Sequence, residues 1–286
     1  MVLEFDNLVM AGNSLFRLFN QKPFFYLQLN KDIDIDETST LDFSMVNGLT
    51  INGTQSENVI TVGNVLYKRL FGIHGNDLHL KGKVQLGEDA TEVEKIVSEV
   101  LITGNDVEVA STGQIESGFI LLQANGTLST KTGSKIESLR DNTCNEATSN
   151  SDLFSCVPRN SLKTHFAAED FIESFNTQFG SNFTELEETI PILMNNYTIY
   201  LVSFNEMFLG GSVLQGSRIG FCAPNITLIN SEIDTAGRGC PSDTGLGKGN
   251  LVANISCAGS GASHGGYGGY GGIEQADDGN VTHDAC

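Results

Sequence analysis

The sequence contains no tryptophan, only 6 tyrosines, and only 16 lysines and arginines in 286 residues. Because 35 acidic residues outnumber the basic ones, the formal net charge is −19, which argues against nucleic acid and anionic membranes as partners. The chain also lacks any apolar run near the ~18 residues that a membrane span needs, so we expect no membrane span. The absence of tryptophan and the low number of tyrosines disfavour a surface on which sugars stack.

Motifs that hold metals and phosphates are missing too. No two cysteines have the CxxC spacing of zinc sites, and no GxxxxGK[ST] loop is present to bind a nucleotide phosphate. We therefore expect no metal and no cofactor. The first residues, MVLEFDNLVMAG, lack the basic and long apolar segments of a signal peptide.

Seven Asn-x-Ser/Thr tripeptides are present, and none has proline in the middle. Seven in one chain predict N-linked glycans and therefore an extracellular protein. Since a secreted chain needs a signal, we expect that Met1 is not the start of the natural precursor. The predicted acceptors are Asn52, Asn125, Asn182, Asn196, Asn225, Asn254 and Asn280.

The six cysteines all lie in the second half of the chain. An even number of cysteines in an oxidising compartment predicts three disulfides, although their spacing leaves about fifteen pairings open. We expect one bridge before the predicted helix, one between adjacent strand layers and one at the C-terminal end. The expected pairs are Cys144–Cys156, Cys222–Cys240 and Cys257–Cys286.

Most of the chain has the periodicity of β-strands. From Asn58 onward, short segments such as NVITVG and DLHLKGKVQLG are separated by Gly, Asn or Asp. Around residues 210–240, apolar positions recur every six or seven residues, at Val213, Ile219, Ile226 and Ile233. This spacing favours a parallel β-helix, whose three-faced coils bury their apolar side chains by stacking. A β-sandwich or jelly roll is the alternative.

One segment has helical periodicity instead. In SLKTHFAAEDFIESFNTQFG, Ser161 is a predicted N-cap and Gly180 a predicted C-cap. We expect an amphipathic helix that packs on a β body through one apolar face, formed by Ala168, Ile172, Phe175 and Phe179.

These patterns divide the chain into five segments. Residues 1–55 are predicted to be strands that cap the domain or pair with another subunit. Residues 56–143 and 190–256 are the two parts of the predicted β-helix, and residues 144–189 are a helical insertion. Residues 257–286 form a glycine-rich, disulfide-linked segment.

The glycine-rich run CAGSGASHGGYGGYGG begins at Cys257 and follows IDTAGRGCPSDTGLGKG. With these motifs, residues 210–272 resemble the glycine-rich, β-helix-like surface proteins of plants, ciliates and other protists, in which GASHGG or GAGHGG coils recur. The resemblance implies an extracellular, wall- or surface-associated location and no particular reaction. We expect the run to be a structural loop and His264 to be a hydrogen-bonding loop residue.

Many β-helices cleave acidic polysaccharides, and glycoside hydrolases among them need two carboxylates that flank the bond. β-Helical pectinases carry Asn-Thr-Asp, Asp-Asp, Gly-His-Gly and Arg-Ile-Lys in that order. This chain has SRIG at 217–220, SHGG at 263–266 and then Asp277-Asp278, so the order is wrong and Asn-Thr-Asp is missing. An acidic protein would also repel a polyuronate. The sequence therefore predicts a protein that is not an enzyme.

Asp32, Asp34 and Asp36 alternate with isoleucine and are predicted to lie on one face of a strand. Such residues lie ~6.5–7 Å apart, whereas Ca²⁺ takes about six to eight oxygens from a loop that wraps around it. We therefore expect a solvated strand edge rather than a calcium site, because charges of this kind discourage edge pairing.

Together, these features predict an all-β, secreted structural glycoprotein of the cell surface or extracellular matrix. The apolar residues 2–29 lack the Gly/Asn rhythm of the body, and the C-terminal end has no recognisable polar cap. Because open strand edges are templates for pairing, we expect the chain to bind itself and form a glycan-coated homopolymeric filament. The alternative is a carbohydrate-binding or polysaccharide-degrading β-helix module.

Overall fold

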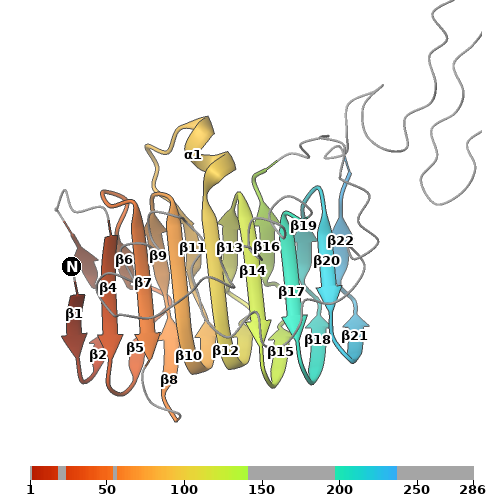
Figure 1. Ribbon diagram of the computed structural model, residues 1–286, viewed down its shortest axis with the longest axis horizontal. Coiled ribbons are helices and arrows are strands. Elements are labelled where there is room, and N and C mark those ends of the chain that lie inside the picture. Colours follow the sequence, from red (N-terminus) through yellow and green to blue (C-terminus); the bar gives the residue numbers. More distant parts are fainter. Residues whose placement is uncertain (1, 19–23, 54–56, 141–196, 237–286) are drawn as a thin grey trace, which may run out of the picture. The chain divides into compact units, whose positions relative to one another are not determined.

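The computed structural model describes residues 2–18, 24–53, 57–140 and 197–236 (Figure 1), and the statements below concern these residues. They form strands β1 to β22 and one helix, α1 (Glu92–Val97). The strands belong to a 14-stranded and an 8-stranded sheet, and all of their pairings are parallel. The all-β prediction is confirmed.

The strands fall into three sets, and the chain passes through the sets in the same order eight times. The first and second sets make up the 14-stranded sheet, and the third set is the 8-stranded sheet. The first set contains β1 (Val2–Phe5), β4 (Phe24–Leu29), β7 (Gly48–Gly53), the first part of β10 (Leu70–Leu80), the first part of β12 (Glu99–Val109), β14 (Phe119–Ala124), β17 (Ile199–Ser203) and β20 (Ile219–Cys222).

The other two sets are built in the same way. The second set contains β2 (Leu8–Met10), β5 (Ile33–Ile35), β8 (Val59–Val62), the last parts of β10 and β12, β15 (Thr127–Thr130), β18 (Glu206–Gly210) and β21 (Asn225–Ile229). The third contains β3 (Leu15–Arg17), β6 (Thr40–Asp42), β9 (Asn64–Tyr67), β11 (Lys83–Leu86), β13 (Gln114–Ser117), β16 (Lys135–Ser138), β19 (Val213–Gln215) and β22 (Glu232–Asp234).

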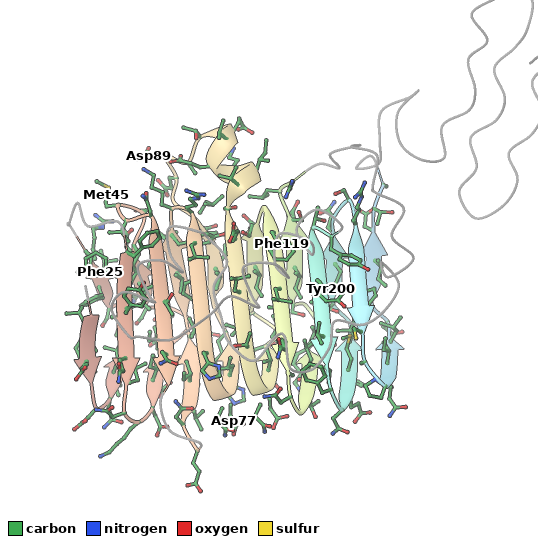
Figure 2. The ribbon with its side chains drawn as sticks, viewed as in Figure 1. Phe25, Met45, Asp77, Asp89, Phe119 and Tyr200 are labelled. Carbon is green, nitrogen blue, oxygen red and sulfur yellow. The ribbon has the colours of Figure 1, made fainter. Side chains whose placement is uncertain are left out.

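Alternation along each strand separates the core from the surface, because successive side chains point to opposite faces. One inward position of the first set is apolar in six successive strands, and each member is paired with the next. Its members are Leu27, Ile51, Ile73, Ile102, Leu122 and Leu201, all of them fully buried. Figure 2 shows the side chains that the strands carry. Each contributes roughly 1.5–3 kcal/mol of hydrophobic stabilisation.

The connections from the third set to the first set vary most in length. Between β13 and β14 the connection is Gly118 alone, whereas residues 87–98, with α1, join β11 to β12. Residues 139–198 join β16 to β17, although β14 and β17 are paired neighbours. Insertions of very different length therefore leave from the same corner of the fold.

Helix α1 was not expected from the sequence, which shows no helical periodicity around it. It has a complete capping box, because Glu94 N donates to Thr91 Oγ1 and Thr91 N donates to Glu94 Oε2. The tetrapeptide TEVE fits the Ser/Thr-x-x-Glu signature and was the available signal. The helix predicted between Ser161 and Gly180 lies outside the described residues, as does the segment 257–286.

Residues 2–53 supply β1 to β7, and these strands continue the same pairing as the rest of the described chain. β7 pairs with β4 on one side and with β10 on the other. The segment predicted as 1–55 therefore contributes to the same two sheets as the later segments.

Two glycines sit where the backbones of successive layers touch. A Cβ built on Gly82 would lie 2.1 Å from the Gly63 carbonyl carbon, and one built on Gly63 would lie 2.0 Å from the Asp36 carbonyl oxygen. Only glycine can be accommodated at such contacts, because the obstructing atoms belong to the backbone. This close approach lies at the corner between the second and third sets.

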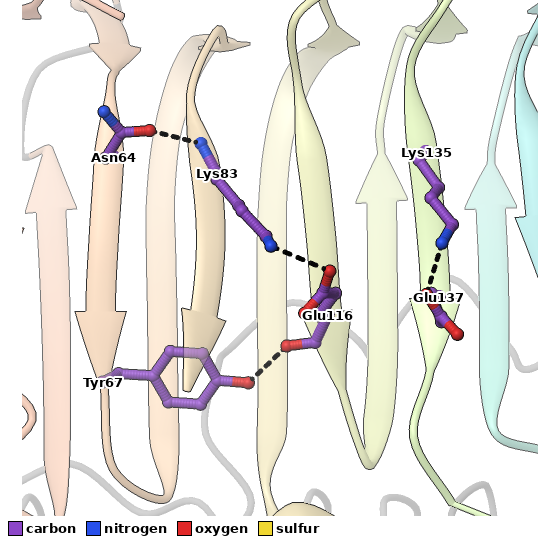
Figure 3. Close-up of polar contacts among 6 residues, drawn as sticks. All are labelled: Asn64, Tyr67, Lys83, Glu116, Lys135 and Glu137. Atoms are coloured by element: carbon purple, nitrogen blue, oxygen red, sulfur yellow. Dashed lines mark hydrogen bonds and ion pairs between the residues drawn. The ribbon is translucent and has the colours of Figure 1, made fainter. Parts of the chain in front are cut away.

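A buried polar cluster lies at another corner, between the third and the first strand sets, and holds adjacent layers together there. The Tyr67 hydroxyl donates to the Glu116 carbonyl oxygen at 2.9 Å, across two layers (Figure 3). Ser98 Oγ accepts from Gly118 N at 2.7 Å and lies 3.2 Å from Ser117 Oγ. Burial raises the pKa of Tyr67 far above its usual value, so the hydroxyl stays neutral and remains a donor.

We expect Tyr67→Phe to lower the free energy of unfolding by about 1–3 kcal/mol, because it removes the donor for a buried carbonyl. Urea denaturation would measure the change. Glu116→Gln is the control: it keeps that carbonyl and removes only the half-exposed ion pair with Lys83 at 3.1 Å (Figure 3), which is worth about 0–1 kcal/mol. Equal losses in the two variants would contradict a special role for the hydroxyl.

Candidate assembly surface

The described strands stop at β20, β21 and β22, and each of these three pairs on one side only, with β17, β18 and β19 respectively. Each of them therefore presents a row of backbone N–H and C=O groups that has no partner strand in the described part of the chain. Such a row is a template for another strand.

Apolar side chains accompany these free edges. Ile226 and Leu228 pair with the fully buried Met207 and Leu209, so they continue the inward rows of the second set. Ile233 continues the third set beyond the fully buried Leu214. Yet Ile226, Leu228 and Ile233 are 43%, 51% and 42% exposed. The interior pattern thus extends into a layer on which the described residues place no further layer. We call Ile226, Leu228 and Ile233 the end surface.

The opposite end has the same alternation. In β1, β2 and β3, the inward residues Leu3, Phe5, Leu8 and Phe16 are partly buried and pack against the core. These strands pair with β4, β5 and β6 only, within the described residues. Both ends of the described stack therefore combine free strand edges with inward apolar side chains.

A shallow hollow of about 240 Å³ lies on the outward surface of the second set. Carboxylates of Asp77, Asp106 and Glu108 line it together with His79. Glu108 forms an ion pair with Lys131, whose Nζ lies 3.0 Å from Glu108 Oε2, and His79 Nδ1 lies 3.7 Å from Glu108 Oε1. The backbone N–H of Thr127 donates a hydrogen bond to Asp106 Oδ1 at 2.6 Å. No group of three or more His, Cys, Asp or Glu side chains in the described residues has the arrangement of a metal site.

One carboxyl of the first set is buried. Glu99 is 5% exposed, and its Oε2 has no hydrogen-bond partner among the described residues. Burial raises the pKa of Glu99 to about 8, and the nearby charges of Arg69 and Arg140 oppose the shift only in part. At neutral pH the neutral acid therefore predominates, which avoids most of the cost of a buried negative charge.

The predicted strand edge at Asp32, Asp34 and Asp36 needs correction. Strand β5, which carries Asp34, pairs with both β2 and β8 and is not an edge. Asp32 accepts a hydrogen bond from Val59 N at 2.8 Å, and Asp36 accepts one from Gly12 N at 2.8 Å. Hydrogen bonds from Gly12, Ser39 and Thr38 lower the pKa of Asp36. Asp32 and Asp36 hold adjacent layers together at corners.

Three of the predicted glycan acceptors lie in the described residues. Asn125 and Asn225 are exposed, and Asn52 is half-buried in β7. Asn182, Asn196, Asn254 and Asn280 lie outside these residues. N-glycosylation of all seven stays a prediction.

Cys222 is 5% exposed and disulfide-bonded. Its predicted partner Cys240 lies outside the described residues, as do Cys144, Cys156, Cys257 and Cys286, so the three pairings stay predictions. His264 and the motifs at 263–266 and 277–278 also lie outside. Arg218 of the SRIG motif is half-buried in the connection before β20.

In comparisons with known proteins, no family model, no curated protein and no solved structure matches this chain. The resemblance of residues 210–272 to glycine-rich surface proteins therefore rests on the sequence alone. The described residues contain no helix that is long and apolar enough to cross a membrane.

The end surface could have been found from the sequence. In NITLINSEID, Ile226, Leu228 and Ile233 have the same spacing as the buried residues of the preceding layer, which are Met207, Leu209 and Leu214. What the sequence pattern does not reveal is that no described strand follows them. Their exposure is a property of the stack and not of the local sequence.

Proposed function

We propose that this chain is a parallel β-helix that stacks end to end into a secreted, structural filament of the cell surface or extracellular matrix. The constant order of the three strand sets supports this fold, because units of this kind gain a continuous core only from their neighbours. The predicted partner is a second copy of the same chain.

The exposure of the end surface carries the proposal. Three aliphatic side chains that occupy inward positions are roughly half exposed, next to three strands that pair on one side only within the described part of the chain. Full burial of each such side chain stabilises by roughly 1.5–3 kcal/mol, and strand pairing adds backbone hydrogen bonds. A layer placed on this end would provide both.

The N-terminal end of another copy has the pattern that this layer needs. If β20, β21 and β22 pair with β1, β2 and β3 of the next copy, apolar inward positions continue through the junction. If the rows continue in register, the pairs brought together would be Phe221 with Leu3, Ile226 with Leu8, Leu228 with Met10, and Ile233 with Phe16. Because the two ends differ, the contact is head-to-tail and produces an open filament.

The sequence supports the location and the structural role. Seven glycan acceptors and six cysteines favour an extracellular chain, and exposed Asn125 and Asn225 are accessible to glycan transfer. The sequence lacks the ordered motifs of β-helical pectinases, and we propose a non-enzymatic role. The charge of −19 on each copy limits lateral aggregation, because like-charged copies repel one another.

Leu228→Lys should abolish filament formation and leave the monomer folded. Leu228 is 51% exposed, so the ammonium stays hydrated in the monomer but would lose its water in a junction. Sedimentation velocity over a concentration series and negative-stain images would measure assembly, and circular dichroism would verify the β content.

Val93→Lys is the matched control, because Val93 is 67% exposed on α1, away from both ends of the stack (Figure 1). It should assemble like the parent. A parent chain that stays monomeric at high concentration, or a Leu228→Lys variant that polymerises normally, would refute the proposal. Point substitutions are preferable to deleting residues 1–29, because the deletion removes β1, β2, β3 and β4 together.

A further inference from the structure

The two ends of the described stack carry opposite charges at one matching position. Arg17 lies in β3, the first strand of the 8-stranded sheet, and Asp234 lies in β22, the last one. Each follows an inward residue, Phe16 or Ile233, and these two belong to one row that is paired strand by strand through the whole sheet. Because successive side chains point to opposite faces, Arg17 and Asp234 occupy equivalent outward positions.

Both side chains are oriented by the adjacent layer or chain of their own copy. Arg17 Nε donates to Asp42, its register partner in β6, and the Arg17 side chain is 43% exposed. Asp234 accepts a hydrogen bond from Gln215 Nε2 at 3.1 Å and another from Ala236 N at 2.8 Å. A guanidinium has about five N–H donors in a planar fork, so one arginine can bind a carboxylate on each of its sides. An acidic residue on a strand added beyond β3 would repeat the arrangement of Asp42.

The remaining charges of the two end layers leave this pair isolated. Arg17 is the only basic residue in the segment 2–18, and the segment 219–236 has two acidic residues, Glu232 and Asp234, and no basic one. In the head-to-tail junction proposed above, Glu4 of the next copy would face Cys222, so that register brings no carboxylates opposite each other in the first set. The charge complementarity of the ends is therefore concentrated at Arg17 and Asp234.

This complementarity distinguishes between three ways of docking the ends. Each end presents three parallel strands with inward apolar residues, so β22 could continue into β3, β1 or β2 of the next copy. On β3, Asp234 faces Arg17. On β1, alignment of Ile233 with either inward residue places Asp234 opposite Glu4 or Asp6, and on β2 it faces an uncharged residue. Only the first rotation pairs opposite charges.

We propose that Asp234 of one copy and Arg17 of the next form the ion pair that sets the rotation of the head-to-tail junction. The proposal rests on the proposed filament and assigns its specificity. Opposite charges on directly opposed residues of neighbouring strands stabilise the pairing, and like charges destabilise it. The apolar inward residues favour burial in every rotation, whereas the charges favour one and oppose another.

Charge reversal at each end tests the ion pair, with Arg17→Glu and Asp234→Arg studied alone and in an equimolar mixture. Alone, each variant brings like charges together at every junction, so the concentration at which filaments appear should rise about tenfold. In the mixture, Asp234 of the first variant meets Arg17 of the second, and the two reversed positions meet each other. The mixture should therefore assemble at the parent's concentration, and an affinity tag on one variant should capture an equal amount of the other.

Glu232→Arg is the matched control, because it changes the charge of the same face of β22 by the same amount but would face Leu15 of the next copy. It should assemble close to the parent's concentration. Equal losses for Glu232→Arg and Asp234→Arg would assign the effect to overall charge and overturn the proposal. Single reversals that assemble like the parent, or a mixture that assembles no better than they do, would also overturn it.

The parent chain separates this result from the filament proposal. A parent that stays monomeric refutes both, whereas a parent that assembles beside a mixture that does not recover refutes the ion pair alone. Because Arg17→Glu places a carboxylate beside Asp42, circular dichroism must show that the β content is kept. If it is lost, the reversal is combined with Asp42→Asn, whose amide oxygen can still accept from Ser44 N and Ser44 Oγ, and the same recovery in the mixture is expected.

Discussion

Glu99→Gln should leave the free energy of unfolding nearly unchanged at pH 4 and raise it by several kcal/mol at pH 8. The folded-state pKa of Glu99 is raised from 4.5 to about 8 by burial. Between these values the unfolded chain has lost the proton while the folded chain retains it. The parent is therefore destabilised progressively as the pH rises through this window, and glutamine, which does not titrate, removes the effect.

The size of the effect follows from the width of the window. Each pH unit is worth about 1.4 kcal/mol, so the difference between variant and parent reaches at most about 5 kcal/mol near pH 8. Urea denaturation of both proteins from pH 4 to pH 8 would measure it, because other titrating groups cancel in the difference.

Glu108→Gln is the control, because Glu108 is a half-buried outward carboxylate paired with Lys131. An exposed ion pair of this kind contributes about 0–1 kcal/mol, so this variant should show a small loss of stability instead of a gain that grows with pH. A difference between Glu99→Gln and the parent that is independent of pH would refute burial as the cause.

Gly82→Ala should destabilise the protein by about 3 kcal/mol or more. The added methyl group would lie 2.1 Å from the Gly63 carbonyl carbon and 2.4 Å from Asn64 N. These are backbone atoms of the adjacent layer, so relief requires a shift of one layer against the next. Overpacking of this kind typically costs about 1–3 kcal/mol, and the rigid neighbours place this site at the upper end.

Gly216→Ala provides the comparison. Its Cβ would meet Thr198 Oγ1 at 3.0 Å and Ile199 Cδ1 at 3.1 Å, which are side-chain atoms that can move by a few tenths of an ångström. Thermal unfolding should show a clearly smaller decrease in Tm than for Gly82→Ala. Similar decreases for both would show that the layers adjust more easily than the contacts imply.

The strand content of the fold was predictable, because short apolar runs separated by Gly and Asn are typical of β-strands and fit few other structures. Val213, Ile219, Ile226 and Ile233 recur at the observed spacing of strands β19 to β22, although only Val213 and Ile233 share a strand set. The register was not predictable, since it depends on partners about 20 residues away, such as Phe119 for Glu99. Alternation identifies the faces of a strand but not its neighbour.

The errors have physical causes as well. The aspartates around β5 were predicted to protect an edge because their charges alternate with isoleucine. In the structure, Asp32 and Asp36 accept backbone hydrogen bonds from the layers on either side. Helix α1 is too short for periodicity to identify, and only its capping box was visible. The buried Glu99 gave no signal, because a glutamate before an apolar run is usually exposed.

The corner from which α1 and residues 141–196 leave also sets the order in which the chain can fold. Most successive layers of the first set are joined through 20–29 residues, as in Glu99↔Phe119 and Leu70↔Glu99, but Ile120 and Ile199 are 79 apart. Loop closure costs about 0.6 kcal/mol more for each doubling in length, so this junction carries about 1.2 kcal/mol of additional chain entropy. The six layers before it can form first, and β17 to β22 then add to a template that already exists.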